Sequence, residues 1–357
     1  MNIAALVSGG VDSSVTIPLL KEMGYDPTIF YIQIGMDDKP GFDCPAEEDM
    51  EITRWIAKKY GCKLEMVSLQ DEYWENVVSY TIKTVKKGFT PNPDIMCNRM
   101  IKFGAFEEKY GKDFDKITTG HYANIIDTPN GHFLATAEDA NKDQTYFLSQ
   151  ITENQVNKLM FPIGHLPKPE VRRIAEIMKL PSAHRPDSQG ICFLGKVNYN
   201  DFIKRFVGEN PGLIIEKESG KILGEHKGIW FHTIGQRRGL GLGGGPWFVV
   251  GKDIPANIIY VSNGYDPISQ YDNKIYLKDL HWINPNFDHQ NLVDIEFKIR
   301  HQPEFTKGKL IRENGNSYIQ SSEKISGIAP GQFGVIYNAE KTICYGGGMI
   351  ADPDYNI

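Results

Sequence analysis

The residues best suited to chemistry stand near the start of the chain, in the run Ser8-Gly9-Gly10-Val11-Asp12-Ser13-Ser14. The apolar residues 3–7 come directly before it and have the character of a parallel strand buried on both faces. Two adjacent glycines permit a sharp turn, because glycine adopts positive φ without steric cost. A helix-compatible stretch, residues 15–23, follows, so we expect the free N–H groups of a helix start to point into the turn. The pattern predicts an anion-binding site.

This run is not a Walker A loop, because it lacks the lysine and the glycine spacing of that motif. It resembles the pyrophosphate loop of ATP-pyrophosphatases, which cut ATP between its α and β phosphates. The small residues before Val11 let backbone amides approach a departing pyrophosphate, and the hydroxyls of Ser13 and Ser14 lie beside them. Asp12 offers a carboxylate for Mg²⁺. The alternative is an ordinary strand-to-helix turn with serine caps.

A second candidate site is the segment Thr90-Pro91-Asn92-Pro93-Asp94-Ile95-Met96-Cys97. Its two prolines impose a stiff, extended approach, and we expect a helix to begin near Cys97. A thiol at a helix start, close to Arg99 and Lys102, is favoured as thiolate, and Asp94 is placed to act as general base or acid. An equally good interpretation makes Asp94 the helix N-cap and Cys97 a small buried hydrophobic residue.

A third candidate is Cys192, in the run Pro186-Asp187-Ser188-Gln189-Gly190-Ile191-Cys192-Phe193-Leu194-Gly195. Glycines on both sides suit a loop that presents sulfur and then withdraws it, whereas the alternative is a structural turn with a buried cysteine. The remaining cysteines, which we interpret as structural, are Cys44, Cys62 and Cys344. Five widely spaced cysteines resemble neither a disulfide scaffold nor a CxxC pair for zinc or redox work.

The overall composition limits the class of protein. At 357 residues the chain is long enough for two or three domains. A net charge of -6 argues against indiscriminate coating of nucleic acid, although it permits a local basic face. Candidates for that face are Lys83, Lys86, Lys87, Lys168, Arg172, Arg173, Arg237 and Arg238. We expect a cytosolic protein with no membrane partner, since no apolar run approaches the length of a membrane span and no basic region precedes an apolar segment at the start.

Strand and helix patterns alternate through the first part of the chain. We expect strands at residues 3–7, 28–34, 63–67 and 116–119, and helices at 45–60, 71–85, 97–110, 170–178 and 199–207. Repeated βα units predict a parallel sheet with helices on both faces, which binds ligands beyond the carboxyl ends of its strands. Gly120 and His121 follow one such end and should lie close to the glycine turn.

The pattern changes in the second part, where short apolar runs are divided by glycines. Such runs stand at residues 212–216, 247–250, 258–261, 293–300 and 334–337. They are typical of small β-barrels. We therefore predict an α/β ATP-pyrophosphatase domain at 1–207, followed by two small β-rich domains at 208–275 and 276–357.

Seven motifs taken together, in order, resemble the bacterial tRNA-specific 2-thiouridylases of the MnmA family. They are SGGVDSS, NPDIMCN with IKFG, GHYA, NKDQTYFL, DSQGICFLG, HTIGQRRGLG and PGQ, and they span almost the whole chain. The resemblance implies an enzyme that uses ATP and Mg²⁺ to replace the C2 oxygen of the wobble uridine with sulfur, in tRNAs for Lys, Glu and Gln. It also implies a sulfur-donor protein, either a cysteine desulfurase or a sulfur-relay carrier.

The same resemblance assigns roles to individual residues. Cys192 would carry sulfur as a persulfide, Cys97 would form a transient disulfide with it, and Asp94 would be the acid/base group. The implied nucleotide contacts are Leu6, Val7, Ser8, Gly9, Gly10, Val11, Asp12, Ser13, Ile32 and Gly120. The implied target-base contacts are Asn92, Pro93 and Asp94, and the implied tRNA contacts are His121, Lys142, Asp143, Gln144, Arg300, His301 and Gln332.

The chain departs from the family pattern at a few places. Ile32 replaces a common methionine, residues 239–246 form a short loop, and His301 replaces a common aromatic residue. Two other functions stay open from the residues themselves. Amide-forming synthetases adenylate a carboxylate with a similar loop and need neither Cys97 nor Cys192, and a sulfur-relay or tRNA-binding protein would carry a degenerate ATP site.

Overall fold

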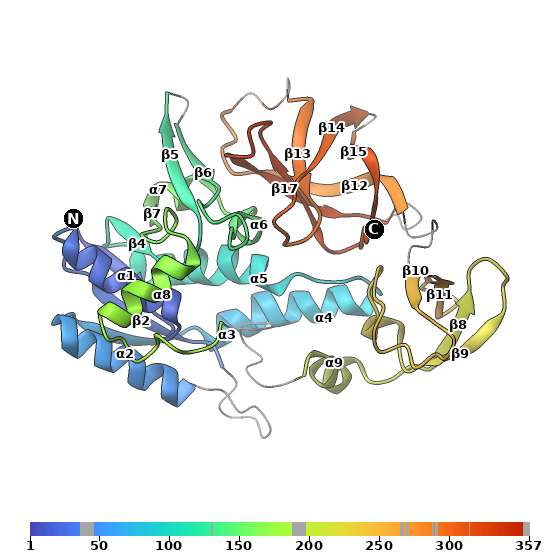
Figure 1. The fold of residues 1–357 in the computed structure, drawn as a ribbon, viewed down its shortest axis with the longest axis horizontal. Coiled ribbons are helices and arrows are strands. Elements are labelled where there is room, and N and C mark those ends of the chain that lie inside the picture. The colour runs from blue at the N-terminus through green and yellow to red at the C-terminus, as the bar shows by residue number, and fades with distance from the viewer. Residues whose placement is uncertain are drawn as a thin grey trace.

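The computed structural model describes residues 1–35, 46–129, 131–187, 198–264, 268, 271–287, 289, 292–313 and 315–352. An α/β region forms one end of the molecule, and two β-rich regions form the other (Figure 1). The helical segment that runs from α4 to α5 lies between them, below the barrel in this view.

The α/β region is built on a five-stranded sheet in the order β3-β2-β1-β4-β7, with every neighbouring pair parallel. Its strands are β1 (Ile3–Leu6), β2 (Thr28–Gln33), β3 (Leu64–Ser68), β4 (Lys116–Thr118) and β7 (Leu159–Met160). The order reverses between β1 and β4, and ligands bind at such a switch point. The predicted α/β fold class is confirmed.

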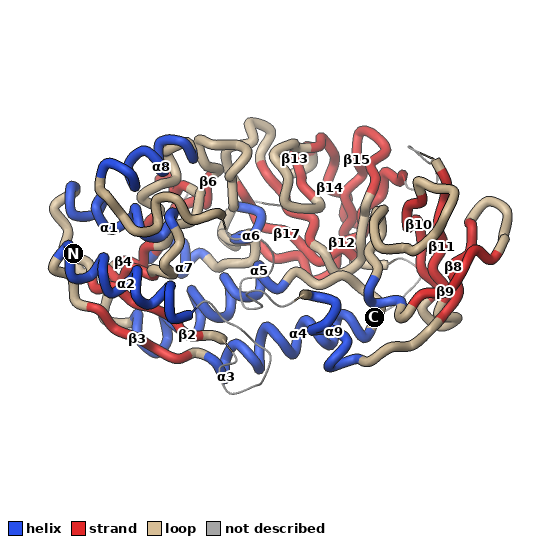
Figure 2. Tube along the Cα trace, turned by 60° about the horizontal axis from the view of Figure 1, so that its bottom comes forward, coloured by secondary structure: helices blue, strands red, loops and turns tan. Residues whose placement is uncertain are grey.

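Helices cover both faces of this sheet, as predicted. The α-helices of the described residues are α1 (Val11–Glu22), α2 (Ala46–Tyr60), α3 (Gln70–Tyr73), α4 (Ser79–Lys86), α5 (Pro93–Met96), α6 (Thr145–Leu148), α7 (Glu153–Lys158), α8 (Lys168–Ile177) and α9 (Tyr199–Val207). Three short π-helical segments continue two of these runs: η1 (Trp74–Val78) joins α3 to α4, and η2 (Cys97–Ala105) and η3 (Glu107–Gly111) follow α5. Figures 1 and 2 both place α8 against α1 and α9 beside α4.

Alternate residues of β1 explain why both faces are buried. Ala4 and Leu6 face the cluster that includes Phe103 of η2, whereas Ile3 and Ala5 face a second cluster formed with α1 and α2. A strand inserted between two helical layers has no polar face, which accounts for the continuous apolar run in the sequence.

Two helix starts differ from the prediction. The first helix begins at Val11, with Gly10 extended as its N-cap, so Asp12 lies in the first turn, where the helix dipole favours a carboxylate. The second begins at Pro93, because Asn92 caps it by accepting a hydrogen bond from the Ile95 amide at 3.3 Å. The interpretation of Asp94 as N-cap is therefore wrong.

The central β-rich region is an open four-stranded sheet in the order β10-β11-β8-β9. Its strands are β8 (Gly212–Glu216), β9 (Ile222–His226), β10 (Trp247–Asp253) and β11 (Ile258–Asn263), with a short 3₁₀ turn at Ile229–Phe231. The described strands do not close into a barrel here, and the predicted β-rich character of this region is confirmed. Side chains such as Trp230, Leu242 and Ile254 cover the apolar face, so further strands are not needed to bury it.

The last region is a closed barrel in the order β12-β15-β14-β13-β16-β17. Its strands are β12 (Tyr271–Trp282), β13 (Asp294–Lys298), β14 (Thr306–Glu313), β15 (Asn316–Ser326), β16 (Phe333–Tyr337) and β17 (Cys344–Ile350). β12 continues across residue 275, where the sequence placed a boundary. A hairpin of β5 (Asn124–Thr128) and β6 (Gly131–Ala135) projects from the α/β region beside the barrel (Figure 1).

Within the described part of the chain, no helix combines the length and the apolar character needed to cross a membrane.

Candidate functional site

The glycine loop, residues 8–14, joins β1 to α1 at the switch point of the sheet. Gly9 has φ +74°, and the N-cap Gly10 offers no side-chain hydrogen bond to the first turn of α1. Ser13 Oγ accepts a hydrogen bond from the Ser8 amide at 3.1 Å, and Ser14 Oγ donates one to the Gly10 carbonyl at 2.7 Å. The loop is thereby held in shape while the helix start stays available for an anion.

Two glycines allow close packing around this loop. A Cβ at Gly120 would lie 2.4 Å from the Ser13 amide nitrogen, and a Cβ at Gly9 would lie 2.7 Å from Asp49 Cα. The end of β4 therefore rests directly on the start of α1, as expected for Gly120. Arg185 fixes the other side, donating to the Gly9 carbonyl at 3.1 Å and to Asp49 Oδ1 at 2.5 Å.

Asp12 is held by a lysine and a tyrosine. Lys168 Nζ, at the start of α8, lies 2.7 and 2.8 Å from the two carboxylate oxygens, and the Tyr122 hydroxyl donates to Oδ1 at 2.8 Å. Burial and the neighbouring Asp12 raise the pKa of Tyr122, so its hydroxyl keeps the proton that it donates. The Lys168 side chain is only 10% exposed, which makes this a well-shielded ion pair.

A second carboxylate extends the network. Asp187 accepts from Lys142 at 2.6 Å and Arg172 at 2.6 Å, and Lys168 lies 2.9 Å away. Burial raises the pKa of Asp187, but the hydrogen bonds and charges of Lys142 and Lys168 outweigh it, so the net pKa is lower than usual. One continuous network of hydrogen bonds and ion pairs thus links Tyr122, Asp12, Lys168, Asp187 and Lys142.

Sequence reasoning missed this network. It treated Lys168, Arg172 and Arg173 as one candidate basic face, but only Arg173 of the three points outward, in an exposed pair with Glu170. Lys168 and Arg172 are four positions apart and share one side of α8, which turns toward Asp187. This spacing of four residues was the sequence feature that could have shown that the two side chains point the same way.

The residues around Asp12 do not form a metal site by themselves. Both Asp12 oxygens accept from Lys168, whose ammonium already compensates the carboxylate charge. Among the described residues, no cluster of three or more His, Cys, Asp or Glu side chains is arranged to hold a metal ion. Mg²⁺ takes most of its ligands from water and phosphate oxygens, so it would have to enter with a phosphate ligand.

The proline segment, residues 90–97, is held by side chains and backbone groups from both β-rich regions. Gln332, just before β16, donates to the carbonyls of Thr90 at 3.2 Å and Pro91 at 2.9 Å. Its Oε1 accepts from Asn92 Nδ2 at 3.2 Å and from the Tyr146 hydroxyl at 3.4 Å. Thr90 also donates its amide to the Pro330 carbonyl at 2.8 Å and its hydroxyl to Thr233 at 3.1 Å.

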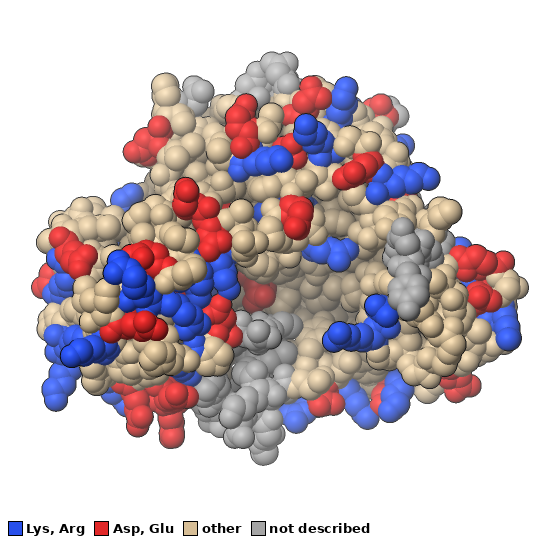
Figure 3. Space-filling model, viewed as in Figure 1, with Lys and Arg blue, Asp and Glu red and all other residues tan. Residues whose placement is uncertain are grey.

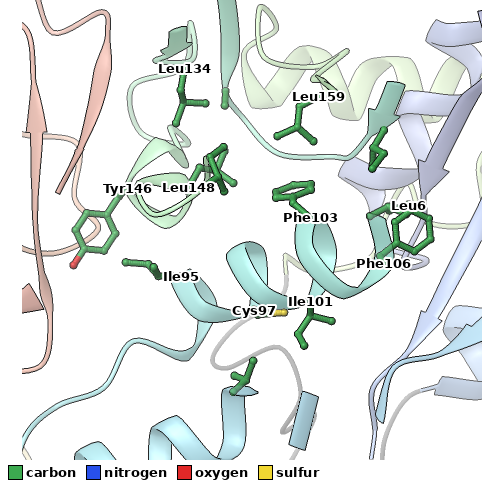
Figure 4. Close-up of a cluster of buried hydrophobic side chains, with 14 of the residues drawn as sticks. Leu6, Ile95, Cys97, Ile101, Phe103, Phe106, Leu134, Tyr146, Leu148 and Leu159 are labelled. Carbon is green, nitrogen blue, oxygen red and sulfur yellow. The ribbon is translucent and has the colours of Figure 1, made fainter. Parts of the chain in front are cut away.

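Cys97 lies at the start of η2 and is only 2% exposed. Figure 4 shows it within a cluster of apolar side chains, on the same helical run as Ile101 and Phe103. The buried-hydrophobe interpretation therefore describes its present surroundings. Asp94, one turn earlier, is half-buried and has interactions of its own. Cys192 and Cys44 lie outside the described residues.

The other predicted nucleotide contacts surround the glycine loop or share its core. Leu6, Val7 and Val11 are buried, and Ile32 packs against the same cluster as Leu6 near the end of β2. Cys97 belongs to this cluster as well. The two candidate sites are therefore joined by one hydrophobic core.

Several predicted tRNA contacts are covered by protein. His121 is buried, hydrogen-bonds Thr119 Oγ1 at 2.8 Å, and has its pKa lowered well below the usual value by burial. Asp143 is buried, accepts from the Thr145 hydroxyl at 2.8 Å, and lies 3.4 Å from Lys298 of the barrel. Gln144 accepts from the Tyr122 amide at 2.9 Å. In this arrangement these side chains bond to other groups of the protein.

Two predicted tRNA contacts remain at the surface. Arg300 and His301 are exposed just beyond β13. Arg300 donates to the Ser326 carbonyl at 3.0 Å, and His301 contacts the Asp143 carbonyl at 2.9 Å and packs on Phe147. Figure 3 shows one face of the molecule, with a hollow between the α/β region and the central sheet and basic side chains on both sides of it.

Known families match the chain in three consecutive parts. A model described as the tRNA methyl transferase HUP domain matches residues 1–196. The tRNA methyl transferase PRC-barrel domain matches residues 200–263, and the aminomethyltransferase beta-barrel domain matches residues 272–350.

Whole-length relatives share one name. The tRNA-specific 2-thiouridylase MnmA of Parabacteroides distasonis is 64% identical over 356 residues, covering 99% of each chain. The tRNA-specific 2-thiouridylase MnmA 1 of Bacteroides thetaiotaomicron is 61% identical, over 98% of this chain and 99% of its own. The tRNA-specific 2-thiouridylase MnmA of Porphyromonas gingivalis is 58% identical over the same shares. With such identity along the whole chain, and with the motif order already described, this chain belongs to the MnmA family of tRNA-specific 2-thiouridylases.

Proposed function

We propose that the chain is an ATP-dependent tRNA-uridine 2-sulfurtransferase acting on the wobble uridine of tRNAs for Lys, Glu and Gln. The observation that carries the proposal is the glycine loop, where an uncapped helix start, the closely packed Gly120 and the Asp12–Lys168 pair meet at the switch point of the sheet. The expected compartment is the cytoplasm. The expected sulfur source is a cysteine desulfurase or a sulfur-relay carrier.

Oxygen at C2 of uracil is a poor leaving group and must be activated. In the proposed reaction this oxygen attacks the α-phosphate of ATP, which forms an O-adenylate and releases pyrophosphate. The backbone N–H groups at the start of α1 would bind the pyrophosphate as its charge develops. Lys168 would bind phosphate oxygens from the opposite side. Mg²⁺ enters only as the counter-ion that ATP brings with it.

Sulfur would then replace the activated oxygen. Cys192 would carry a persulfide, and attack by the Cys97 thiolate on its inner sulfur would form a disulfide and release hydrosulfide. Hydrosulfide would add at C2 and expel AMP, while Asp94 would accept or return a proton at the reacting base. Direct attack by the persulfide on C2 is the alternative route, and it leaves Cys97 as a resolving thiol.

The burial of Cys97 makes this proposal testable by reactivity. Because the thiol is 2% exposed, it should resist alkylation in the free protein and react once ATP and tRNA are bound. Peptide mass mapping after brief alkylation would measure this. Equal labelling of Cys97 with and without both ligands would count against its role in the relay.

The main experiment combines purified protein, ATP, Mg²⁺, sulfide and an unmodified tRNA with uridine at the wobble position. AMP and 2-thiouridine, both scored by mass spectrometry, should appear together. Cys192→Ser should lose thiolation when sulfur is supplied through a donor protein, whereas Cys62→Ser, a half-buried cysteine beside Lys21, should not. AMP without a thiolated base would mean that the assignment of the loop is right and that the acceptor or the sulfur route is wrong. Neither product, with tRNA still bound, would favour a binding protein.

A further inference from the structure

A cavity of about 680 Å³ lies where the central sheet, the barrel and the segment after α4 meet. Figure 1 shows these elements converging near β10 and β12. Residues from all three parts form its wall, among them Phe89, Lys252, Tyr260, Lys274, Tyr276 and Ile328. The cavity is separate from the glycine loop and has no place in the reaction described above.

Lys252 gives the cavity its main chemical feature. Its ammonium donates one hydrogen bond, to the Gly88 carbonyl at 2.7 Å, and it forms no salt bridge with any of the described residues. Burial lowers the pKa of Lys252 to about 7, which is the response of an amine that lacks a nearby negative charge. A lysine has three N–H donors, so two remain for a ligand.

Three acidic residues line the cavity: Asp253 and Asp272 are turned toward the backbone, and Asp352 has an interaction of its own. Asp253 Oδ1 accepts from the Ala256 amide at 3.0 Å, and Asp272 Oδ1 accepts from the Asn273 amide at 2.7 Å and the Lys274 amide at 3.3 Å. These carboxylates shape turns and leave Lys252 uncompensated. The lysine is thus the group that would attract an anion into the cavity.

Aromatic rings and further cations complete the wall. Lys217 lies over the Tyr260 ring at 4.6 Å, and Lys274 lies 4.6 Å from the ring of Tyr318, which packs against Tyr276. Tyrosine faces next to lysines are the combination that binds single-stranded nucleic acid, with stacking for bases and charge for phosphates.

The location of the cavity limits the class of ligand that it could bind. Phe89 and Thr90 line it, and Asn92, the first implied target-base contact, comes two residues later along an extended chain. Two extended residues span about 7 Å, which is short enough for neighbouring nucleotides of one splayed loop to reach both places. Enzymes that extrude a base often read the flanking nucleotides as well.

We propose that this cavity binds a nucleotide next to the target uridine in the substrate RNA, with Lys252 on its phosphate and a tyrosine, Tyr260 in the first place, against its base. The inference rests on the proposed function, since it takes the RNA substrate from there.

The first test measures binding of an unmodified anticodon stem–loop RNA by fluorescence anisotropy over a salt series. Lys252→Met should weaken binding about tenfold at low salt and lower the slope of log affinity against log salt by about one. Lys221→Met, at an exposed lysine in the turn between β8 and β9, is the matched control and should change neither. Lys252→Arg should keep most of the affinity, and ATP affinity should be unchanged in all three. Wild-type affinity and slope in Lys252→Met would overturn the proposal.

A second test uses stem–loops with an abasic site on either side of the target uridine. At one of these positions, loss of the base should weaken binding to the wild type severalfold but have little effect on Tyr260→Leu, because both changes remove the same stacking contact. Independent, additive losses at both positions would overturn the assignment. If the wild-type protein does not bind the stem–loop at all, the proposed function is wrong. If it binds tightly and neither Lys252→Met nor Tyr260→Leu changes that binding, only the assignment of the cavity is wrong.

Discussion

The glycine loop and the proline segment are held in place in different ways. Around the glycine loop, charged groups of the α/β region do the holding, through Lys168 with Asp12 and Arg185 with Asp49. Around the proline segment, uncharged hydrogen bonds from distant parts of the chain dominate, above all those of Gln332 and Thr233. The glycine loop, the nucleotide end of the proposed reaction, is therefore held within one region of the molecule. The proline segment, the base end, depends on three regions.

This contrast implies that the two ends can be damaged separately. Variants near the proline segment should impair sulfur transfer while ATP still binds, and variants near the glycine loop should impair ATP binding while RNA still binds. The shared hydrophobic core, which contains both Leu6 and Cys97, sets a limit to this independence.

The largest effect is expected from Cys97→Ala at the base end. Sulfur transfer should fall by at least about 10³-fold, since the nucleophile of the relay is removed, while ATP affinity stays within about twofold of wild type. Donor-dependent thiolation and ATP titration by calorimetry would measure the two quantities. Alanine avoids placing a hydroxyl in the apolar cluster, and Cys62→Ala serves as control. A parallel loss of ATP affinity would mean that the ends are not separable.

The matching change at the nucleotide end is Gly120→Ala. Its Cβ would lie 2.4 Å from the Ser13 amide nitrogen, so the start of α1 must shift. A displacement near 1 Å in a catalytic group costs about 10²-fold in rate, and we expect a loss of that order in ATP-dependent AMP formation. RNA affinity should be unaffected. Gly243→Ala, where the new Cβ meets nothing within 4 Å, should behave as wild type; normal AMP formation in Gly120→Ala would refute the close-packing argument.

A smaller effect is expected from Gln332→Leu. The change removes the side-chain amide of Gln332, which bonds the carbonyls of Thr90 and Pro91 and the side-chain amide of Asn92. The proline segment should therefore be held less firmly. We expect kcat for thiolation to fall about tenfold, with RNA affinity within about twofold. Gln302→Leu, at a half-buried glutamine of the same region that bonds only the nearby Glu304 carbonyl among the described residues, is the control. Weaker RNA binding with unchanged kcat would show instead that Gln332 is a direct tRNA contact.

The smallest effect concerns acid stability of the central sheet, which supports the proline segment through Thr233. Burial, together with the adjacent His226, lowers the pKa of His232 to about 4. Between the ordinary pKa of 6.5 and this value, the unfolded chain binds a proton that the folded chain does not, so stability falls as pH drops through that window. From pH 7 to 5.5 the part of this loss that comes from His232 should be about 1 kcal/mol, and His232→Phe should remove that part.

Urea unfolding at both pH values would measure this difference. His165→Gln, at an exposed histidine, is the control. We also expect thiolation to decline before ATP binding as pH falls. An unchanged pH dependence in His232→Phe would rule out this histidine as the cause.

Local patterns were sufficient to predict much of the α/β region. Alternation and apolar runs gave β1, β2 and α9 nearly as they are, because each buries its own apolar residues. The β5–β6 hairpin was missed although its strands are adjacent in sequence. The long β12 and β15 were missed because they pair with each other across a long stretch of sequence.

The candidate site was predicted in its parts but not in its connections. The glycine loop and the proline segment have local signatures, whereas the link from Asp12 through Lys168 to Asp187 joins residues more than a hundred positions apart. Gln332 was expected to touch tRNA, yet its side-chain amide meets Pro91, which no local pattern reveals. The roles of Cys192, Cys97 and Asp94, and the domain limits, stay predictions.

The position of Gln332 late in the chain also bears on how the protein is made. During synthesis the parallel sheet and the glycine loop can form once the residues up to Asp187 have emerged, because the contacts described for them lie within that length. The proline segment cannot adopt its observed position until the barrel strands around Gln332 have folded. An incomplete chain would therefore form the glycine loop before the proline segment is held in place.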